Sequence, residues 1–415
     1  MKSIDEQMRR AIKKPRIRTE HFQLIKHSSY SKLWLTMLLV GGLLAQRASA
    51  LITVETVPVG NAGNTADTFP RLGAVGYDYS IGKYEVTLNQ YTAFLNAVAK
   101  TDTYGLYNGN MGTELRVRGI ARSGVSGSYT YSVIGSGNRP VTYVSWYDSA
   151  RFVNWLHNGQ PNGLQTAGTT ETGAYTLTGN SGLITRNAGW IYGLPSRDEW
   201  YKAAYHQPAS QGGDVDDYWL YPTRSNAAPN SRNGSASDPD SANFYRDDGI
   251  ANGFNGGYAV NNSTTMPVGN VLTDVGAFGL SASFYGTFDQ GGNVFEWDDV
   301  LIGSSRKRSG GSWILDEYDM RSSSGNFIEP FNELFDTGFR VVMFVPVEAP
   351  VLNRSQSGNT LIFSWTGNFK LQVQTNSLSV GVSTNWSDYP SGGASPVNVT
   401  LNPANPAVFF RLSSP

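Results

Sequence analysis

The residue types with the most chemical potential lie in three glycine-rich motifs of the second half of the chain. They are residues 291–297 (GGNVFEW), 308–313 (RSGGSW) and 338–341 (GFRV). Each motif sets an indole, a carboxylate or a guanidinium beside glycine, whose backbone turns tightly and lets a bulky ring lie against it. The motifs predict a compact, loop-rich domain and indicate where it is held together. They do not by themselves indicate a reaction.

The residues that are absent restrict the chemistry more sharply. The sequence contains no cysteine, so it offers no disulfide, no thiolate nucleophile and no soft metal ligand. Beyond residue 50 only His157 and His206 remain, too few for a three-histidine zinc or iron site. The sequence also lacks a Gly-x-Ser-x-Gly elbow and a P-loop, and no paired carboxylates stand out.

The first fifty residues predict a Sec-type signal peptide. Residues 1–32 are basic, residues 33–45 are apolar, and residues 48–50 (ASA) have the small-x-small form of a signal-peptidase site. The apolar run is short for a membrane span, although the long basic region leaves an uncleaved anchor as the alternative. We expect a mature chain that begins at Leu51 and is secreted, periplasmic or attached to the cell envelope.

Composition and charge favour an ordered extracellular protein. Aromatic residues make up 12% of the chain, charged residues 16%, and there are 46 glycines, a combination typical of turn-rich, β-containing structure. Removing residues 1–50 takes away ten Lys/Arg and three Asp/Glu, which changes the net charge from −1 to −8. A mildly acidic chain without a basic stripe is not expected to bind nucleic acid. No further membrane span or C-terminal anchor is expected.

Three amphipathic helices are predicted to position the motifs. They begin after Thr87, Ser145 and Ser196, each followed by apolar residues at helical spacing. Gln90 and Glu199 stand at the third helical position and predict capping boxes. We therefore interpret Glu199 as a cap and not as a catalytic acid.

Long loops and a separate β module complete the expected organisation. Residues 101–138 predict an ordered loop with a hairpin at 127–133, and residues 207–266 predict long ordered loops whose acids are either solvated or bound to ions. Residues 346–350 (PVEAP) indicate a short linker. Alternating apolar and polar residues then predict a small β-sandwich over residues 351–415.

Seven motifs in order resemble the formylglycine-generating enzyme, or sulfatase-modifying factor, family over residues 55–345. The motifs are residues 84–87, 140–146, 194–200, 267–269, 292–297, 310–313 and 338–340. The resemblance implies an α+β domain at 51–345, a variant of the C-type lectin fold with little regular secondary structure. With the C-terminal β module, two folded domains are expected.

The same resemblance implies that the oxidase chemistry is lost. The family's oxidases bind copper through two cysteines between the GGS-aromatic and GFR motifs. Here that interval, residues 314–337, contains Arg321 and Ser322 but no cysteine, and Ser322 stands near the place of one thiol. A hydroxyl does not bind Cu(I) as a thiolate does, so copper and formylglycine-generating activity are not expected. The iron sites of related histidine-rich members are excluded by the missing histidines.

Two structural Ca²⁺ sites are also implied by the resemblance. One corresponds to Asn243 and Phe244, and the other to Asn293 and Glu296. Side-chain and carbonyl oxygens of these residues suit a hard cation. In the alternative interpretation, Asn293 closes a turn and Glu296 pairs with an arginine.

Three function classes remain open on sequence. The first is a binding or scaffold protein of the cell envelope that takes an extracellular peptide, protein or glycan. Its candidate binding face comprises Trp297, Arg308, Ser312, Trp313, Arg321 and Ser322. The second is an enzyme with non-cysteine chemistry, and the third is a structural envelope component. A cleft with Tyr, Arg, Ser and a perturbed titratable group would favour the enzyme, and a shallow aromatic groove would favour binding.

Overall fold

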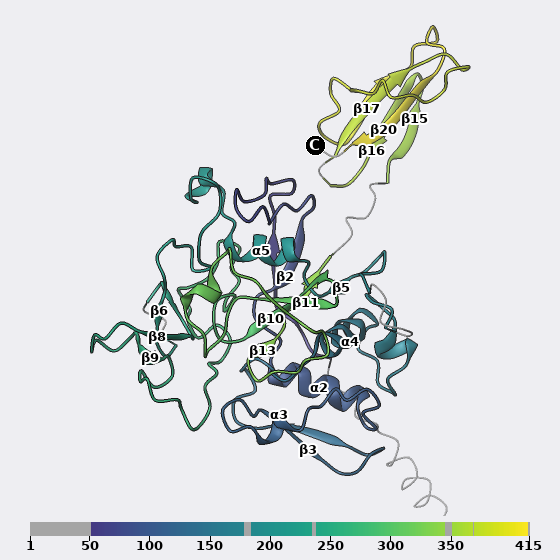
Figure 1. Ribbon diagram of the computed structural model, residues 1–415. Coiled ribbons are helices and arrows are strands. Elements are labelled where there is room, and N and C mark those ends of the chain that lie inside the picture. The colour runs from purple at the N-terminus through teal and green to yellow at the C-terminus, as the bar shows by residue number, and fades with distance from the viewer. Residues whose placement is uncertain (1–50, 178–183, 235–237, 345–350, 368, 414–415) are drawn as a thin grey trace, which may run out of the picture. The chain divides into compact units, whose positions relative to one another are not determined.

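A computed structural model describes residues 51–177, 184–234, 238–344, 351–367 and 369–413 of the chain (Figure 1). The predicted signal peptide at 1–50 and the predicted linker at 346–350 lie outside the described residues. Two bodies of structure are considered separately below, residues 51–344 and residues 351–413.

The three predicted helices are confirmed, together with their caps. They are α2 (Leu88–Val98), α4 (Trp146–His157) and α5 (Arg197–Tyr205), and a short helix α3 spans Asn110–Thr113. Thr87 and Ser196 form capping boxes with the residues three positions on, and Ser145 forms one with Asp148. Side-chain oxygens thus satisfy backbone N–H groups that a helix start leaves without partners.

Helices α2 and α4 lie side by side (Figure 1), and aromatic side chains pack between them. The ring centroids of Phe94 and Phe152 lie 5.4 Å apart at an interplanar angle of 81°, and Tyr91 packs against both rings. Phe339, from the GFR motif, closes the same cluster on the Phe152 side at 5.3 Å. Edge-to-face aromatic packing therefore joins the helices to the glycine-rich motifs.

Two four-stranded sheets hold the rest of the domain. The first has the antiparallel order β1-β2-β14-β5, with β1 Thr56–Val59, β2 Tyr79–Gly82, β14 Val342–Met343 and β5 Tyr192–Gly193. The second has the order β12-β11-β10-β13, with β12 Asn326–Ile328, β11 Ser305–Ser309, β10 Phe295–Ile302 and β13 Thr337–Gly338. β10 carries the 291–297 motif into the middle of the domain (Figure 1).

The remaining elements are short and lie in the long loops. The predicted hairpin is present, but its first strand starts earlier than expected, so that β3 (Ile120–Ser123) pairs with β4 (Thr130–Val133). Residues 207–266 contain the pairs β6 (Asn230–Ser231) with β7 (Ser241–Ala242) and β8 (Tyr245–Asp247) with β9 (Gly256–Tyr258). Single helical turns are η1 (Ala167–Glu171), η2 (Ala209–Gln211) and η3 (Glu317–Met320).

The C-terminal strands form two three-stranded antiparallel sheets. One has the order β15-β16-β19 (Asn353–Ser357, Thr360–Ser364, Val397–Thr400), and the other β18-β17-β20 (Ser387–Asp388, Lys370–Thr375, Val408–Ser413). Leu371, Val397 and Val399 are buried as their alternation with polar residues predicts. The rings of Phe363 and Phe410, from different sheets, have centroids 4.5 Å apart. Apolar faces of the two sheets thus pack together as in a sandwich.

Among the described helices, none combines the length and the apolar composition that crossing a bilayer requires.

Candidate functional site

Five of the six members of the sequence-predicted binding face are buried, Trp297 and Ser312 most completely. Trp297 is 0% exposed, and its indole N–H donates to the Val144 carbonyl at 2.9 Å. Ser312 is also 0% exposed, and its hydroxyl has no hydrogen-bond partner among the described residues. A ligand arriving from solvent cannot reach either side chain. The placement of Trp297 and Ser312 on a surface is therefore corrected: both side chains are fully buried, and Trp297 belongs to the main hydrophobic core together with residues of α2 and α4.

The other four residues of that set do not form one surface. Trp313 is buried, and its indole N–H lacks a partner among the described residues. Arg308 is held by Asp336 at 2.9 Å and lies over the Phe295 ring. Arg321 is partly exposed, and Ser322 is buried beside it.

Arg321 is held by aromatic neighbours, and within the described residues it forms no ion pair. Its Nε donates to the Tyr221 hydroxyl at 2.9 Å, and its guanidinium lies 4.0 Å from the centroid of the exposed Tyr318 ring. The backbone N–H of Ser322 donates to the Leu220 carbonyl. Of the six predicted residues, only Arg321 is not buried.

Glu296 forms a fully buried ion pair with Arg340. Nε and Nη2 of Arg340 donate to the two carboxylate oxygens at 2.5 Å each, and the Trp200 indole adds a third bond at 2.7 Å. Both charged side chains are 0% exposed. This is the pairing named above as the alternative to calcium. Its oxygens are already used by cationic and neutral donors, so as packed Glu296 does not fit a cation site.

Asn293 and its neighbours are bonded mainly to one another. The side-chain oxygen of Asn293 accepts from Asn243 Nδ2 at 3.1 Å and from the Thr273 backbone N–H at 3.2 Å. The Phe244 carbonyl accepts from the Ser231 hydroxyl at 2.6 Å. The Asn243 side-chain oxygen accepts no hydrogen bond from the described residues. Within this part of the chain no three acidic or histidine side chains come together as a metal-binding group, and calcium binding stays a prediction.

The donor set does not fit the copper of the family's oxidases. Cysteine is absent from the sequence. His157 Nδ1 accepts from the Ile191 N–H, and His206 stacks on the Tyr285 ring with its Nδ1 2.7 Å from the Tyr285 hydroxyl. Burial lowers the pKa of His206 to about 4. Within the described residues, the partners of the two imidazole rings are Ile191, Tyr218 and Tyr285, none of which belongs to the interval 314–337.

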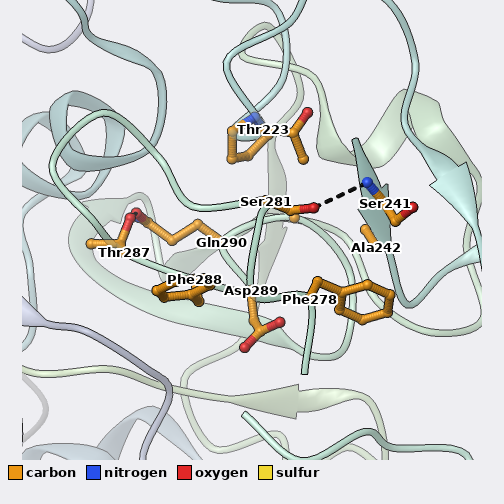
Figure 2. Close-up of a pocket in the computed structure, with 11 residues that line it drawn as sticks. Thr223, Ser241, Ala242, Phe278, Ser281, Thr287, Phe288, Asp289 and Gln290 are labelled. Carbon is orange, nitrogen blue, oxygen red and sulfur yellow. Dashed lines mark hydrogen bonds between the residues drawn. The ribbon is translucent and has the colours of Figure 1, made fainter. Parts of the chain in front are cut away.

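A small cavity lies directly before the 291–297 motif (Figure 2). Thr287, Asp289 and Gln290 line it on one side, and Ser281, whose hydroxyl accepts from the Ser241 backbone N–H, on another. Its volume is about 10 Å³, close to the space that a single water molecule needs. It is therefore too small for an organic ligand.

A much larger open cleft of about 330 Å³ lies at the start of α4. We call it the Asp148 cleft, and it combines aromatic, apolar and charged side chains from four separate segments. It is lined by Tyr104, Ser145, Tyr147, Asp148, Arg151, Leu177, Ile184, Phe331 and Glu333. Its volume lies at the lower end of the roughly 300–1,000 Å³ typical of small-ligand sites.

Asp148 is the most deeply buried acid of this cleft, at 2% exposed. Its Oδ2 accepts from the Ser145 N–H at 2.9 Å and from the Ser145 hydroxyl at 2.6 Å, which completes the cap of α4. Its Oδ1 accepts no hydrogen bond from the described residues. Burial raises the pKa of Asp148 to about 7, and the nearby Glu333 charge acts in the same direction. One oxygen therefore serves the helix, and the other remains available.

Arg151 lies one turn further along α4 and is already neutralised. Its Nε and Nη2 donate to the two oxygens of Glu171 at 2.8 and 3.0 Å. Its guanidinium lies 4.2 Å from the centroid of the Tyr104 ring. The bidentate pair fixes the guanidinium in the cleft wall, and Nη1 donates to none of the described residues.

Glu333 approaches the cleft from the segment before β13. One of its oxygens accepts from the Asn108 side-chain amide. Burial raises its pKa, and the charge of Asp102 adds to the effect. Within the described residues, neither Glu333 nor Asp148 takes part in an ion pair.

Sequence reasoning did not find this cleft. Ser145 was identified only as a helix cap, and nothing in the sequence distinguishes Asp148 from the other third-position capping acid, Glu199. Glu333 comes from the interval examined for cysteines, where an acid carries no signal of its own. Asp148 and Glu333 line the same cleft because two segments that are distant in the sequence fold against each other.

The capped helices, short strands and glycine-indole core define an α+β domain with little regular secondary structure. Residues 29–345 match the family described as "Sulfatase-modifying factor enzyme 1-like domain". The chain belongs to this family, and residues 51–344 have its formylglycine-generating-enzyme-like fold.

Solved structures were also compared with the chain. "Crystal Structure of CarF" is 21% identical, with a TM-score of 0.43, and the match covers 71% of this chain and 100% of the other. A variable protein 1 from Treponema denticola is 16% identical, with a TM-score of 0.40 and coverage of 71% and 97%. PvdO from Pseudomonas aeruginosa is 16% identical, with a TM-score of 0.35 and coverage of 71% and 92%. A search of curated proteins gave no match.

Proposed function

We propose that this member of the sulfatase-modifying factor family is an exported binding protein of the cell envelope. Its ligand is an extracellular peptide, protein or glycan, and the Asp148 cleft is the binding site. The Asp148 cleft carries the proposal, because it is large enough for a small group and keeps unused polar atoms on Asp148 and Arg151. Phe331 and Glu333 come from the interval in which the family's oxidases carry their cysteines.

The aromatic walls support binding as the main role. Tyr147 and Phe331 line the cleft, and Phe331 is 65% exposed. Rings of this kind offer large contact area at a small loss of conformational entropy. The expected oxidase chemistry needs thiolates that the sequence does not contain.

The binding role is tested on arrays of defined peptides and glycans with the purified full chain and two matched variants. Tyr147→Ala removes an aromatic wall of the Asp148 cleft, and Tyr318→Ala removes an exposed ring from the surface around Arg321. We expect at least one ligand to be retained, with at least tenfold loss in Tyr147→Ala and no loss in Tyr318→Ala. No retained ligand, or a loss confined to Tyr318→Ala, would overturn the assignment to the cleft.

Two further measurements examine the remaining parts of this proposal. A Cys-x-Pro-x-Arg peptide incubated with the chain, Cu(I) and oxygen should keep its thiol mass, and aldehyde formed above a protein-free control would contradict the non-oxidase assignment. N-terminal sequencing of exported protein should begin at Leu51, whereas a start at Met1 would contradict a cleaved signal.

A second candidate function is acid-base catalysis in the same cleft. It is favoured by Asp148, whose pKa of about 7 suits proton transfer at neutral pH, beside Glu333. Following the mass of any retained ligand over time separates the two roles. Conversion that is lost in Asp148→Asn would establish the enzyme.

A further inference from the structure

The charges that line the Asp148 cleft do not cancel. Arg151 is paired with Glu171, whose Oε1 also accepts from the Thr170 hydroxyl at 2.8 Å. This leaves Asp148 and Glu333 as carboxylates without a cationic partner among the described residues. When both are ionised, the cleft carries two uncompensated negative charges. Such a site attracts cations and repels anions.

The walls of the cleft suit an organic cation better than a hydrated metal ion. Leu177 and Ile184 provide apolar surface on one side, and the rings of Tyr147 and Phe331 line the same space. An alkyl stem packs against apolar side chains while its charged end reaches a polar group. Aromatic faces also attract ammonium groups. Arg151 over the Tyr104 ring already shows this contact at the cleft wall.

The burial of Asp148 also favours a bound cation. The residue is 98% removed from solvent, it forms no ion pair within the described residues, and one of its two oxygens accepts nothing from them. The charge of Arg151 favours its ionised form in part, but that guanidinium is already bonded to Glu171. Burying a carboxylate without a counter-charge is unfavourable, and its raised pKa reflects that cost. A bound cation would replace the lost hydration and restore the ionised form.

We infer that the Asp148 cleft binds an alkyl ammonium group, with Asp148 and Glu333 holding the charge and the aromatic and apolar walls holding the stem. This inference rests on the proposed binding function and specifies its ligand. The shared chemistry is a primary ammonium on a flexible chain, whether it belongs to a lysine side chain or to a free diamine.

Calorimetric titration of the full chain at pH 8 tests the inference with four probes. Nα-acetyl-lysine methylamide and 1,5-diaminopentane carry the ammonium in its peptide and free forms. The Nε-acetylated lysine probe has the same stem without the charge, and Nα-acetyl-glutamate methylamide carries the opposite charge. We expect binding of at least one ammonium probe, and at least tenfold weaker binding of the neutral and acidic probes.

Two charge-removing variants locate the site. Asp148→Asn keeps an oxygen for the helix cap, and Glu333→Gln keeps one for Asn108, so both changes retain the structural contacts. Each should weaken binding of the ammonium probe at least tenfold, while Asp247→Asn, at the exposed end of β8, should leave that binding unchanged. Circular dichroism and melting temperature identify any variant that fails to fold, and the other variant then decides.

The outcomes separate this inference from the proposed function. Equal or tighter binding of the neutral or acidic probe, lost in Tyr147→Ala, would overturn the cation inference and leave a binding cleft. Binding of the ammonium probes that is insensitive to both charge variants would also overturn it. No binding of any probe would overturn the cation inference, and the array result then decides separately on the binding function.

Discussion

At the scale of single residues, the most constrained group is the Glu296–Arg340 pair. Both side chains are fully buried, and Arg340 also donates to the carbonyls of Gly82 at 2.9 Å and Phe288 at 2.8 Å. Its guanidinium thus ties the 291–297 motif to β2 and to the loop before β10. Glu85 is buried nearby with no hydrogen-bond partner for its carboxyl among the described residues, and burial raises its pKa well above the usual value.

Removing the Glu296 charge should strongly destabilise the fold. Glu296→Gln leaves a buried guanidinium without its counter-charge, which costs about 3–5 kcal/mol. The matched control Glu55→Gln removes an exposed ion pair with Lys83, and a loss of about 0–1 kcal/mol of stability is expected. Urea unfolding of both variants measures the difference. Equal urea midpoints for the two variants would mean that the buried ion pair contributes no more to stability than the exposed ion pair.

Asp148 should make stability depend on pH. Its pKa rises from 3.8 unfolded to about 7 folded, so the folded state holds the proton more tightly. Glu333 and Arg151 face it, with Glu171 paired to Arg151, and Ser145 bonds to it from the cap. This contribution is present below pH 4 and is lost as the pH rises to 7, by an amount on the order of 4 kcal/mol.

The prediction for Asp148 is tested by the difference between wild type and Asp148→Asn. Other buried acids with a raised pKa, such as Asp299, change the unfolding free energy with pH in the same way in both proteins. Their contribution therefore cancels in the difference between wild type and variant. Unfolding free energies at pH 4, 5, 6 and 7 should decline less steeply in the variant. Parallel pH profiles would contradict a raised pKa at this position.

At the scale of elements, the capped helices set the geometry of both the core and the cleft. The cap of α4 uses the same Asp148 that lines the cleft, so the helix start and the binding site share one carboxylate. The cap of α5 uses Glu199, which also accepts from the Tyr77 hydroxyl at 2.5 Å and pairs with Arg186 at 3.0 Å. This confirms Glu199 as a cap that also links neighbouring segments.

Loss of the α5 cap should have a moderate effect. In Ser196→Ala the Glu199 N–H loses the serine oxygen that accepts from it at 3.1 Å. About 1 kcal/mol of stability is expected to be lost, and Ser196→Thr should restore most of it. Ser323→Ala, an exposed position, serves as control. If Ser196→Ala and the control had the same melting temperature in thermal unfolding, the cap would contribute nothing to stability.

At the scale of the whole molecule, calcium remains a prediction of the family resemblance. The oxygens of Glu296 are bonded to Arg340 and Trp200, whereas the side-chain oxygen of Asn243 is unused, so we expect an ion only at Asn243 and Phe244. An ion that binds the folded state alone adds about 2.7 kcal/mol at a hundredfold excess over Kd. EDTA should lower the Tm of protein prepared with calcium.

The variant Asn243→Ala should abolish the difference in Tm between calcium and EDTA, and the exposed Asn162→Ala should preserve it. An EDTA-independent Tm in the wild type would contradict calcium binding at both predicted segments.

The sequence by itself determined the features that depend on neighbouring residues. Helix starts at Thr87, Ser145 and Ser196 follow from side chains that bond to backbone groups three positions away. The C-terminal strands follow from alternation along a few residues. Seven ordered motifs identified the family, and the absence of cysteine excluded thiolate chemistry without any knowledge of the fold.

Only the tertiary structure decided which polar groups face inward and which line a cleft. The residue types of Trp297 and Ser312 are compatible with either a surface or a core, and only the tertiary structure shows that both side chains are fully buried. Likewise, Asp148 and Glu333 have no relation in the sequence. They meet because α4 and the segment before β13 pack together, and the charge of the cleft is a property of that contact and not of either segment alone.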